Sequence, residues 1–169
     1  ANSGLSERDL PPLDGFDAAF LSGYSLFNPL STDGVVRMMQ SIREKGIPLF
    51  FDPASVGTMK AFGRERVLQY LPLMDLVVMN DAEARFISSQ EDLSKALESL
   101  TTLVPTVVIK TGSSGAIAQI RNNKRVDCPV DEIEPLDTTG AGDAFAAGFI
   151  PTWLKSGDLY SSMMADRKS

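Results

Sequence analysis

The segment Asp137-Thr138-Thr139-Gly140-Ala141-Gly142-Asp143-Ala144-Phe145 places two glycines and an aspartate at the expected start of a helix. Gly140 and Gly142 have no Cβ, so the backbone can approach a ligand closely there. A helix start offers unpaired amides and the positive end of the helix dipole, and both favour an anion. Asp143 would stay ionised in the first turn and could accept a proton from a hydroxyl beside that anion. The combination indicates phosphoryl transfer to an alcohol, although spacing alone favours a purely structural glycine turn before a helix.

Upstream of this segment, short apolar runs alternate with longer amphipathic stretches. Such alternation predicts an α/β fold with a mainly parallel sheet and crossover helices. We expect the strands at 18–22, 48–51, 76–79 and 106–109, and the helices between them at 32–45, 59–71 and 91–103.

The rhythm changes after the fourth run. Two short segments, 116–120 and 124–128, are joined by a turn with paired asparagines, which predicts an antiparallel β-hairpin. A last helix should begin near Ala141 and run toward Leu154. Pro151 predicts a kink or an early end of that helix, because proline removes a helical hydrogen bond.

Composition excludes several classes of function. The 169 residues include 16 Lys and Arg against 22 Asp and Glu, and the net charge of −6 argues against a nucleic-acid partner. The chain has no histidine, so acid–base chemistry must rely on other groups, with a carboxylate as the leading candidate. A single cysteine, Cys128, fits a reducing compartment. No apolar run has membrane-spanning length and residues 1–12 are polar, so we expect a soluble cytoplasmic protein of one domain without a membrane partner.

Residues 137–149 resemble the C-terminal signature of the ribokinase-like carbohydrate kinases, also called the PfkB family. The resemblance implies a ribokinase-like three-layer sandwich. It also implies that Gly140, Ala141 and Gly142 form an anion hole for the transferred phosphate. Asp143 would be the catalytic base that activates the substrate hydroxyl.

Three shorter stretches stand in the family's order. Residues 51–53 resemble a family strand end and indicate topology only. Asn80 and Glu83 match the family's Asn-x-x-Glu motif, which implies binding of magnesium through water and of the nucleotide. The same two residues are equally a helix N-cap and the end of a capping box. Residues 107–116 resemble the strand and glycine turn beside the nucleotide, which implies that Lys110, Gly112 and Gly115 are nucleotide neighbours; Thr139 is a further one.

The resemblance covers nearly all of residues 1–169 but corresponds to the C-terminal, nucleotide-binding half of a family member. The substrate-binding aspartate, Gly-Gly motif and small β lid of the N-terminal part have no counterpart. We therefore expect the intact kinase to phosphorylate a hydroxymethyl group of a sugar or nucleoside with ATP and Mg²⁺, while this chain alone is inactive. A monovalent cation and self-association into a homo-oligomer are further expectations. A non-catalytic nucleotide-binding or assembly module is the alternative, and a P-loop kinase is disfavoured because its motif is absent.

Overall fold

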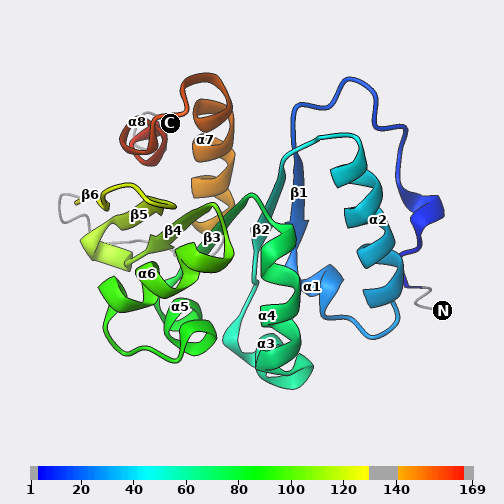
Figure 1. Cartoon of the computed structure of the whole chain (residues 1–169), viewed down its shortest axis with the longest axis horizontal. Coiled ribbons are helices and arrows are strands. Elements are labelled where there is room, and N and C mark those ends of the chain that lie inside the picture. The colour runs from blue at the N-terminus through cyan, green and yellow to red at the C-terminus, as the bar shows by residue number, and fades with distance from the viewer. Residues whose placement is uncertain (1–3, 130–140, 166–169) are drawn as a thin grey trace.

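The protein is described here by a computed structural model that covers residues 4–129 and 141–165, without the side chains of 141–144. Its core is a six-stranded sheet in the order β1-β2-β3-β4-β5-β6 (Figure 1). The first four strands are parallel and the last two are antiparallel. The strands are β1 Ala19–Ser22, β2 Leu49–Asp52, β3 Leu76–Asn80, β4 Thr106–Lys110, β5 Ala116–Ile120 and β6 Val126–Cys128. The expected α/β sheet of four parallel strands and a hairpin is confirmed.

Helices connect the parallel strands, and two further helices follow the hairpin in the described part of the chain. They are α1 Gly23–Leu26, α2 Thr32–Glu44, α3 Val56–Phe62, α4 Arg64–Tyr70, α5 Asp81–Ser88, α6 Leu93–Leu103, α7 Ala141–Ser156 and α8 Leu159–Met163. Three short 3-10 turns, at Glu7–Asp9, Leu71–Leu73 and Gly112–Ser114, complete the described elements.

The prediction of one helix over residues 59–71 was wrong. Two short helices, α3 and α4, stand there instead, and the chain turns at Gly63 between them. Gly63 has φ 101°, a backbone conformation that other residues rarely adopt. The apolar positions continue across the break, which is why periodicity alone suggested a single helix.

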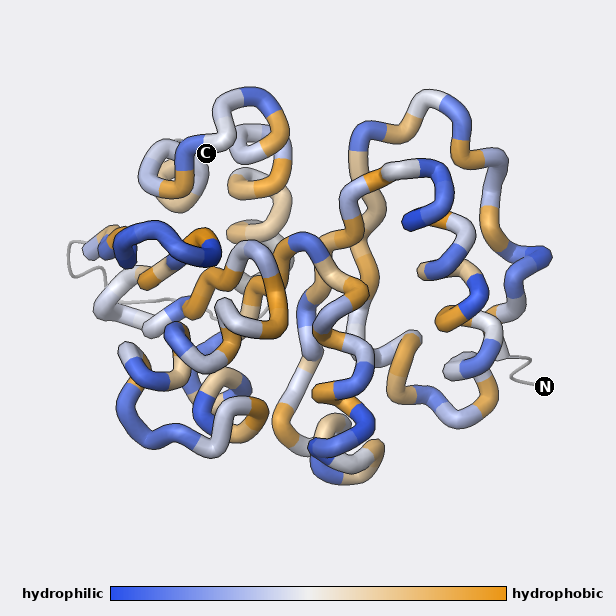
Figure 2. Tube along the Cα trace, in the orientation of Figure 1, coloured by the Kyte–Doolittle hydropathy of each residue, from blue (hydrophilic) through white to orange (hydrophobic). Residues whose placement is uncertain are grey.

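Two apolar cores lie on opposite faces of the sheet and give three layers. One core packs helices α1 to α6 against one face, and the other packs α7 and α8 against the opposite face. Alternate strand residues divide between the cores, as the two-residue repeat of a strand requires: Phe51 and Val77 belong to the first, Phe50 and Val78 to the second. Figure 2 shows hydrophilic and hydrophobic residues alternating along α2, as burial on one side requires.

The expected hairpin is present as β5 and β6. Asn122 in its turn has φ 64°, in agreement with the tolerance of asparagine for the left-handed region. Of the two effects expected of Pro151, an early end of the helix is excluded, because α7 continues through Pro151 to Ser156, and a kink there stays a prediction. Phe149, which is fully buried, stacks against Phe145 and Trp153 and holds both sides of the proline on the sheet. None of the helices within the described residues has the length and apolarity to cross a bilayer.

Candidate functional site

Three polar residues end neighbouring parallel strands. Asp52, Asn80 and Lys110 are the last residues of β2, β3 and β4, and Asn80 lies opposite Lys110 in the β3–β4 register. The carboxyl ends of parallel strands share one edge of the sheet. Each of the three stands two positions after a core residue of the α7 face, namely Phe50, Val78 and Val108. Their side chains therefore emerge on the face that α7 and α8 cover.

Asn80 and Glu83 are held together by three hydrogen bonds. The Asn80 amide oxygen accepts from the Glu83 backbone N–H at 2.9 Å, so Asn80 is the N-cap of α5. In return, Glu83 Oε2 accepts from the Asn80 backbone N–H at 2.8 Å, which completes a capping box. Glu83 Oε1 accepts from Asn80 Nδ2, also at 2.8 Å. The capping geometry predicted as one interpretation of this motif is confirmed, and it leaves the proposed ligand-binding role untested.

Glu83 is almost fully buried, with 3% of its surface exposed. Burial raises the pKa of its carboxyl group because the charged form loses solvation, and the negative charge of Asp52 acts in the same direction. The Asn80 hydrogen bonds and the positive charge of Lys110 lower this pKa and oppose the shift. The carboxylate thus lies within electrostatic range of both Asp52 and Lys110.

Asp52 and Lys110 form an ion pair across the end of β3. Lys110 Nζ lies 3.7 Å from Asp52 Oδ2, and each side chain is about one-fifth exposed. The two strands are separated by β3, so their backbones are about 10 Å apart, a gap that the long lysine side chain bridges. Lys110 was predicted as a nucleotide neighbour, whereas Asp52 was given no chemistry. The sequence signal that could have identified Asp52 as a site residue was its position as a charged residue after an apolar run, the same position that Lys110 has.

Glycines shape the turn that follows Lys110. Gly112 has φ 62° and Gly115 has φ 96°, both in the region that favours glycine. The Thr111 backbone N–H donates to the Gly115 carbonyl at 2.8 Å and closes the turn into β5. The structural need for both glycines is therefore clear, and their expected contact with a nucleotide stays a prediction.

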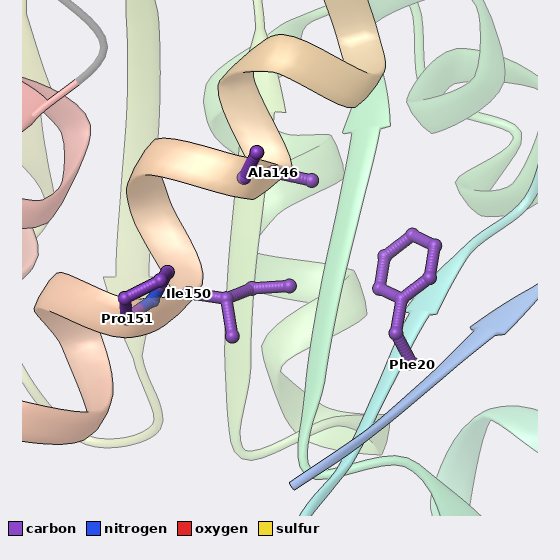
Figure 3. A pocket seen from close by; sticks show the side chains of 5 residues that line it. Phe20, Ala146, Ile150 and Pro151 are labelled. Carbon is purple, nitrogen blue, oxygen red and sulfur yellow. The ribbon is translucent and has the colours of Figure 1, made fainter.

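The first turn of α7 carries three of the predicted site residues. Ala141, Gly142 and Asp143 belong to this helix, whereas Thr139 and Gly140 lie outside the described residues. In Figure 3, the parallel strands beside α7 point toward the end of the helix at which Ala146 lies and away from Pro151. The helix therefore begins on the side of the sheet where the parallel strands end.

The oxygen atoms of Asn80 and Glu83 at the strand ends suit a hard cation such as Mg²⁺ only through bridging water molecules. Both oxygens of Glu83 and the amide oxygen of Asn80 already accept hydrogen bonds. Within residues 4–129 and 145–165, no three Asp, Glu or Cys side chains gather closely enough to hold a metal ion. Carboxylate oxygens keep further lone pairs, so Glu83 and Asn80 fit a magnesium ion that retains its water shell.

A shallow apolar pocket of about 320 Å³ lies beside α7 at the β1 edge of the sheet (Figure 3). Phe20 of β1 faces Ala146, Ile150 and Pro151 across it, and Phe20 is 47% exposed. This pocket contains none of the predicted site residues.

Curated kinases are similar to this chain in sequence. An ATP-dependent ribose-1-phosphate kinase from Halopiger xanaduensis is 31% identical over 127 residues, which cover 75% of this chain and 40% of that protein. A fructokinase from Salmonella typhimurium is 28% identical over 158 residues, covering 90% of this chain and 51% of that protein. The chain spans about half the length of these curated relatives.

Solved structures share the fold. Adenosine kinase from Sinorhizobium meliloti superposes with a TM-score of 0.86 at 23% identity, covering 96% of this chain and 50% of that one. Fructokinase from Vibrio cholerae, solved with fructose, ADP and calcium, gives a TM-score of 0.82 at 22% identity and covers 98% of this chain and 57% of that one. The model of the pfkB family carbohydrate kinases matches residues 2–163, so the chain belongs to this family.

Proposed function

We propose that this chain supplies the phosphate-donor side of a kinase that transfers a phosphoryl group from ATP to a hydroxymethyl group of a sugar or nucleoside. Residues 1–169 would form its nucleotide-binding part. The observation that carries the proposal is the convergence of Asp52, Asn80 and Lys110 at one sheet edge, with buried Glu83 bonded to Asn80 and with α7 beginning on that side.

The charges of this edge suit a polyphosphate and its cation. Lys110 offers an ammonium group and the start of α7 offers backbone amides, and both stabilise phosphate oxygens. Glu83 and Asn80 would hold Mg²⁺ through water, and the ion would neutralise charge on the phosphates. The turn at Gly112 and Gly115 would border the nucleotide, with Thr139 nearby; a monovalent cation is a further candidate at this site.

The chemical step would use the first turn of α7. Gly140, Ala141 and Gly142 would form the anion hole for the transferred phosphoryl group. The Asp143 carboxylate would take the proton of the acceptor hydroxyl. The hydroxyl oxygen would then bond to the γ-phosphorus as the bond from that phosphorus to ADP breaks and ADP leaves. This assignment is supported by the family membership and by the position of Ala141, Gly142 and Asp143 in the first turn of α7.

Two measurements test the proposal. Calorimetric titration of the 169-residue chain with ATP, with and without Mg²⁺, should show binding that magnesium strengthens. The natural gene product at its full length should release ADP from ATP only when an acceptor is present. The acceptors to screen are ribose 1-phosphate, fructose, 2-dehydro-3-deoxygluconate and adenosine, the kinds of substrate that the relatives' names indicate.

The outcomes separate the candidate functions. ATP binding without acceptor-dependent ADP release over a broad acceptor panel would favour a non-catalytic nucleotide-binding module. Absence of ATP binding by both the chain and the full-length product would contradict the proposal. A cytoplasmic location is part of the same proposal, since an ATP-dependent sugar kinase needs the intracellular pool of its donor.

A further inference from the structure

The ammonium group of Lys110 lies at the ends of the parallel strands. The charge of Asp52 orients it, and it can still donate hydrogen bonds. Its ion pair with Asp52 has an N–O distance of 3.7 Å, longer than a charge-assisted hydrogen bond. This ammonium group makes no hydrogen bond within the described part of the chain. Lys110 is therefore attracted to Asp52, while its donors can still serve an anion.

Asp52 is itself held in one orientation. Its Oδ1 atom accepts from the Ala54 backbone N–H at 2.8 Å, while Oδ2 faces Lys110. Ala54 has φ 71°, an uncommon conformation for a residue with a side chain, so the turn after β2 is specifically formed. One carboxylate oxygen thus fixes the turn and the other is directed at the lysine.

Glu83 is not the carboxylate that orients Lys110. Its two oxygens accept from the backbone and side-chain N–H groups of Asn80, and only 3% of its surface is exposed. Asp52 is therefore the carboxylate best placed to orient the ammonium group of Lys110.

We propose that Asp52 is a positioning residue that holds the Lys110 ammonium group where it receives the phosphate groups of the donor nucleotide. The proposal rests on the proposed function, because it takes ATP as the bound anion. It adds a role for a strand-end aspartate that binds no ligand itself and acts through the lysine two strands away.

Removal of the Asp52 charge has two opposing effects. Loss of orientation returns rotamer freedom to a long side chain and weakens binding of an anion. Loss of a negative charge strengthens binding of an anion, but only while the charges are unscreened. At about 1 M salt the screening length in solution is about 3 Å, which weakens the longer-range repulsion between Asp52 and a bound anion. The Asp52–Lys110 pair is screened less because its side chains are only about one-fifth exposed, so the effect of orientation dominates there.

The first experiment measures binding of ATP by calorimetry at low salt and at about 1 M salt. The variants are Asp52→Asn, Asp52→Glu, Lys110→Met and the Asp52→Asn/Lys110→Met double variant. Asp127→Asn is the matched control, since Asp127 of β6 pairs with Arg125 and lies opposite Ile117, so its side chain is on the other face of the sheet from Asp52 and Lys110. Thermal melts establish that each variant is folded.

At high salt, Asp52→Asn should weaken ATP binding about fivefold, because the bound lysine must then lose part of the rotamer entropy that Asp52 already removes in the wild type. Asp52→Glu should recover part of the loss because it keeps the charge, and Asp127→Asn should change nothing. In the Lys110→Met background, Asp52→Asn should have no further effect. An equal loss in that background, or wild-type affinity of Asp52→Asn at high salt, would overturn the proposal.

A second experiment does not depend on nucleotide. NMR relaxation of ¹³C-labelled lysine side chains should show the Lys110 Cε more ordered than that of exposed Lys124, and Asp52→Asn should abolish the difference. If neither the wild-type chain nor the full-length product binds ATP but Asp52→Asn releases Lys110, the proposed function fails while the orientation of Lys110 by Asp52 stands. Unchanged Lys110 order in Asp52→Asn would overturn the positioning role.

Discussion

Replacement of Asn80 tests whether this residue does more than cap α5. Asn80→Ala removes the amide oxygen that accepts from the Glu83 N–H and the Nδ2 group that donates to Glu83 Oε1. Asn80→Ser keeps a capping oxygen but loses the donor to the buried carboxylate. The two substitutions therefore separate the cap from the support of Glu83.

The expected cost follows from these two bonds. Loss of an asparagine N-cap costs about 1 kcal/mol. A hydrogen bond to a charged group contributes about 1.5–3 kcal/mol, and the lower figure applies because Asn80 itself is exposed. Asn80→Ala should therefore lower the free energy of unfolding by about 2–3 kcal/mol, and Asn80→Ser by about 1–2 kcal/mol.

Urea denaturation at neutral pH, followed by circular dichroism, measures these differences. Asp92→Ala is the matched control, because Asp92 caps α6 by accepting from the Lys95 N–H without a capping box. It should cost only about 1 kcal/mol. If Asn80→Ala costs no more than Asp92→Ala, or if Asn80→Ser is as destabilising as Asn80→Ala, Asn80 does not support Glu83 as described.

Three further predictions concern other parts of the molecule. Asp143→Asn in the full-length gene product should keep ATP binding but lower kcat by a factor of about 10² or more; steady-state kinetics decides, and near-normal turnover would leave Asp143 as a helix-start residue only. Burial raises the pKa of Glu83 above its ordinary value of 4.5, so the folded state holds this proton more tightly than the unfolded state does. The stability of the wild type relative to Glu83→Gln should therefore fall as the pH rises from 4.5 through the pKa of the folded state. Urea titrations without magnesium between pH 4 and 7 test the sign, and a relative stability that rises with pH would contradict it. Because β1 is an edge strand and Phe20 is exposed, the 169-residue chain should self-associate at micromolar concentration, and Phe20→Asp should weaken the self-association. Sedimentation measures both, and a monomeric wild type would contradict the prediction.

Local patterns were enough to predict most of the fold. The parallel strands followed from short apolar runs, and the hairpin turn followed from paired asparagines, one of which adopts the left-handed conformation. The bonds between Asn80 and Glu83 followed from their separation of three residues, because a capping box closes within a single helical turn. Each of these features depends on residues that are close neighbours in the chain.

Features set by packing were not predictable in the same way. The apolar face continues from α3 into α4, so periodicity could not reveal that the chain turns at Gly63. Proline usually weakens a helix, yet Pro151 remains within α7, where Phe149 and its aromatic neighbours pack on the sheet. In both places tertiary contacts decided between conformations that the local sequence allowed.

The charged edge shows the division most clearly. The sequence by itself determined that Asp52, Asn80 and Lys110 each directly follow an apolar run expected to be a strand. Only the tertiary structure decided that Asp52 pairs with Lys110, 58 positions further along the chain. The pairing exists because the strand order β2-β3-β4 puts their carboxyl ends at one edge and the strand repeat turns both side chains to the α7 face.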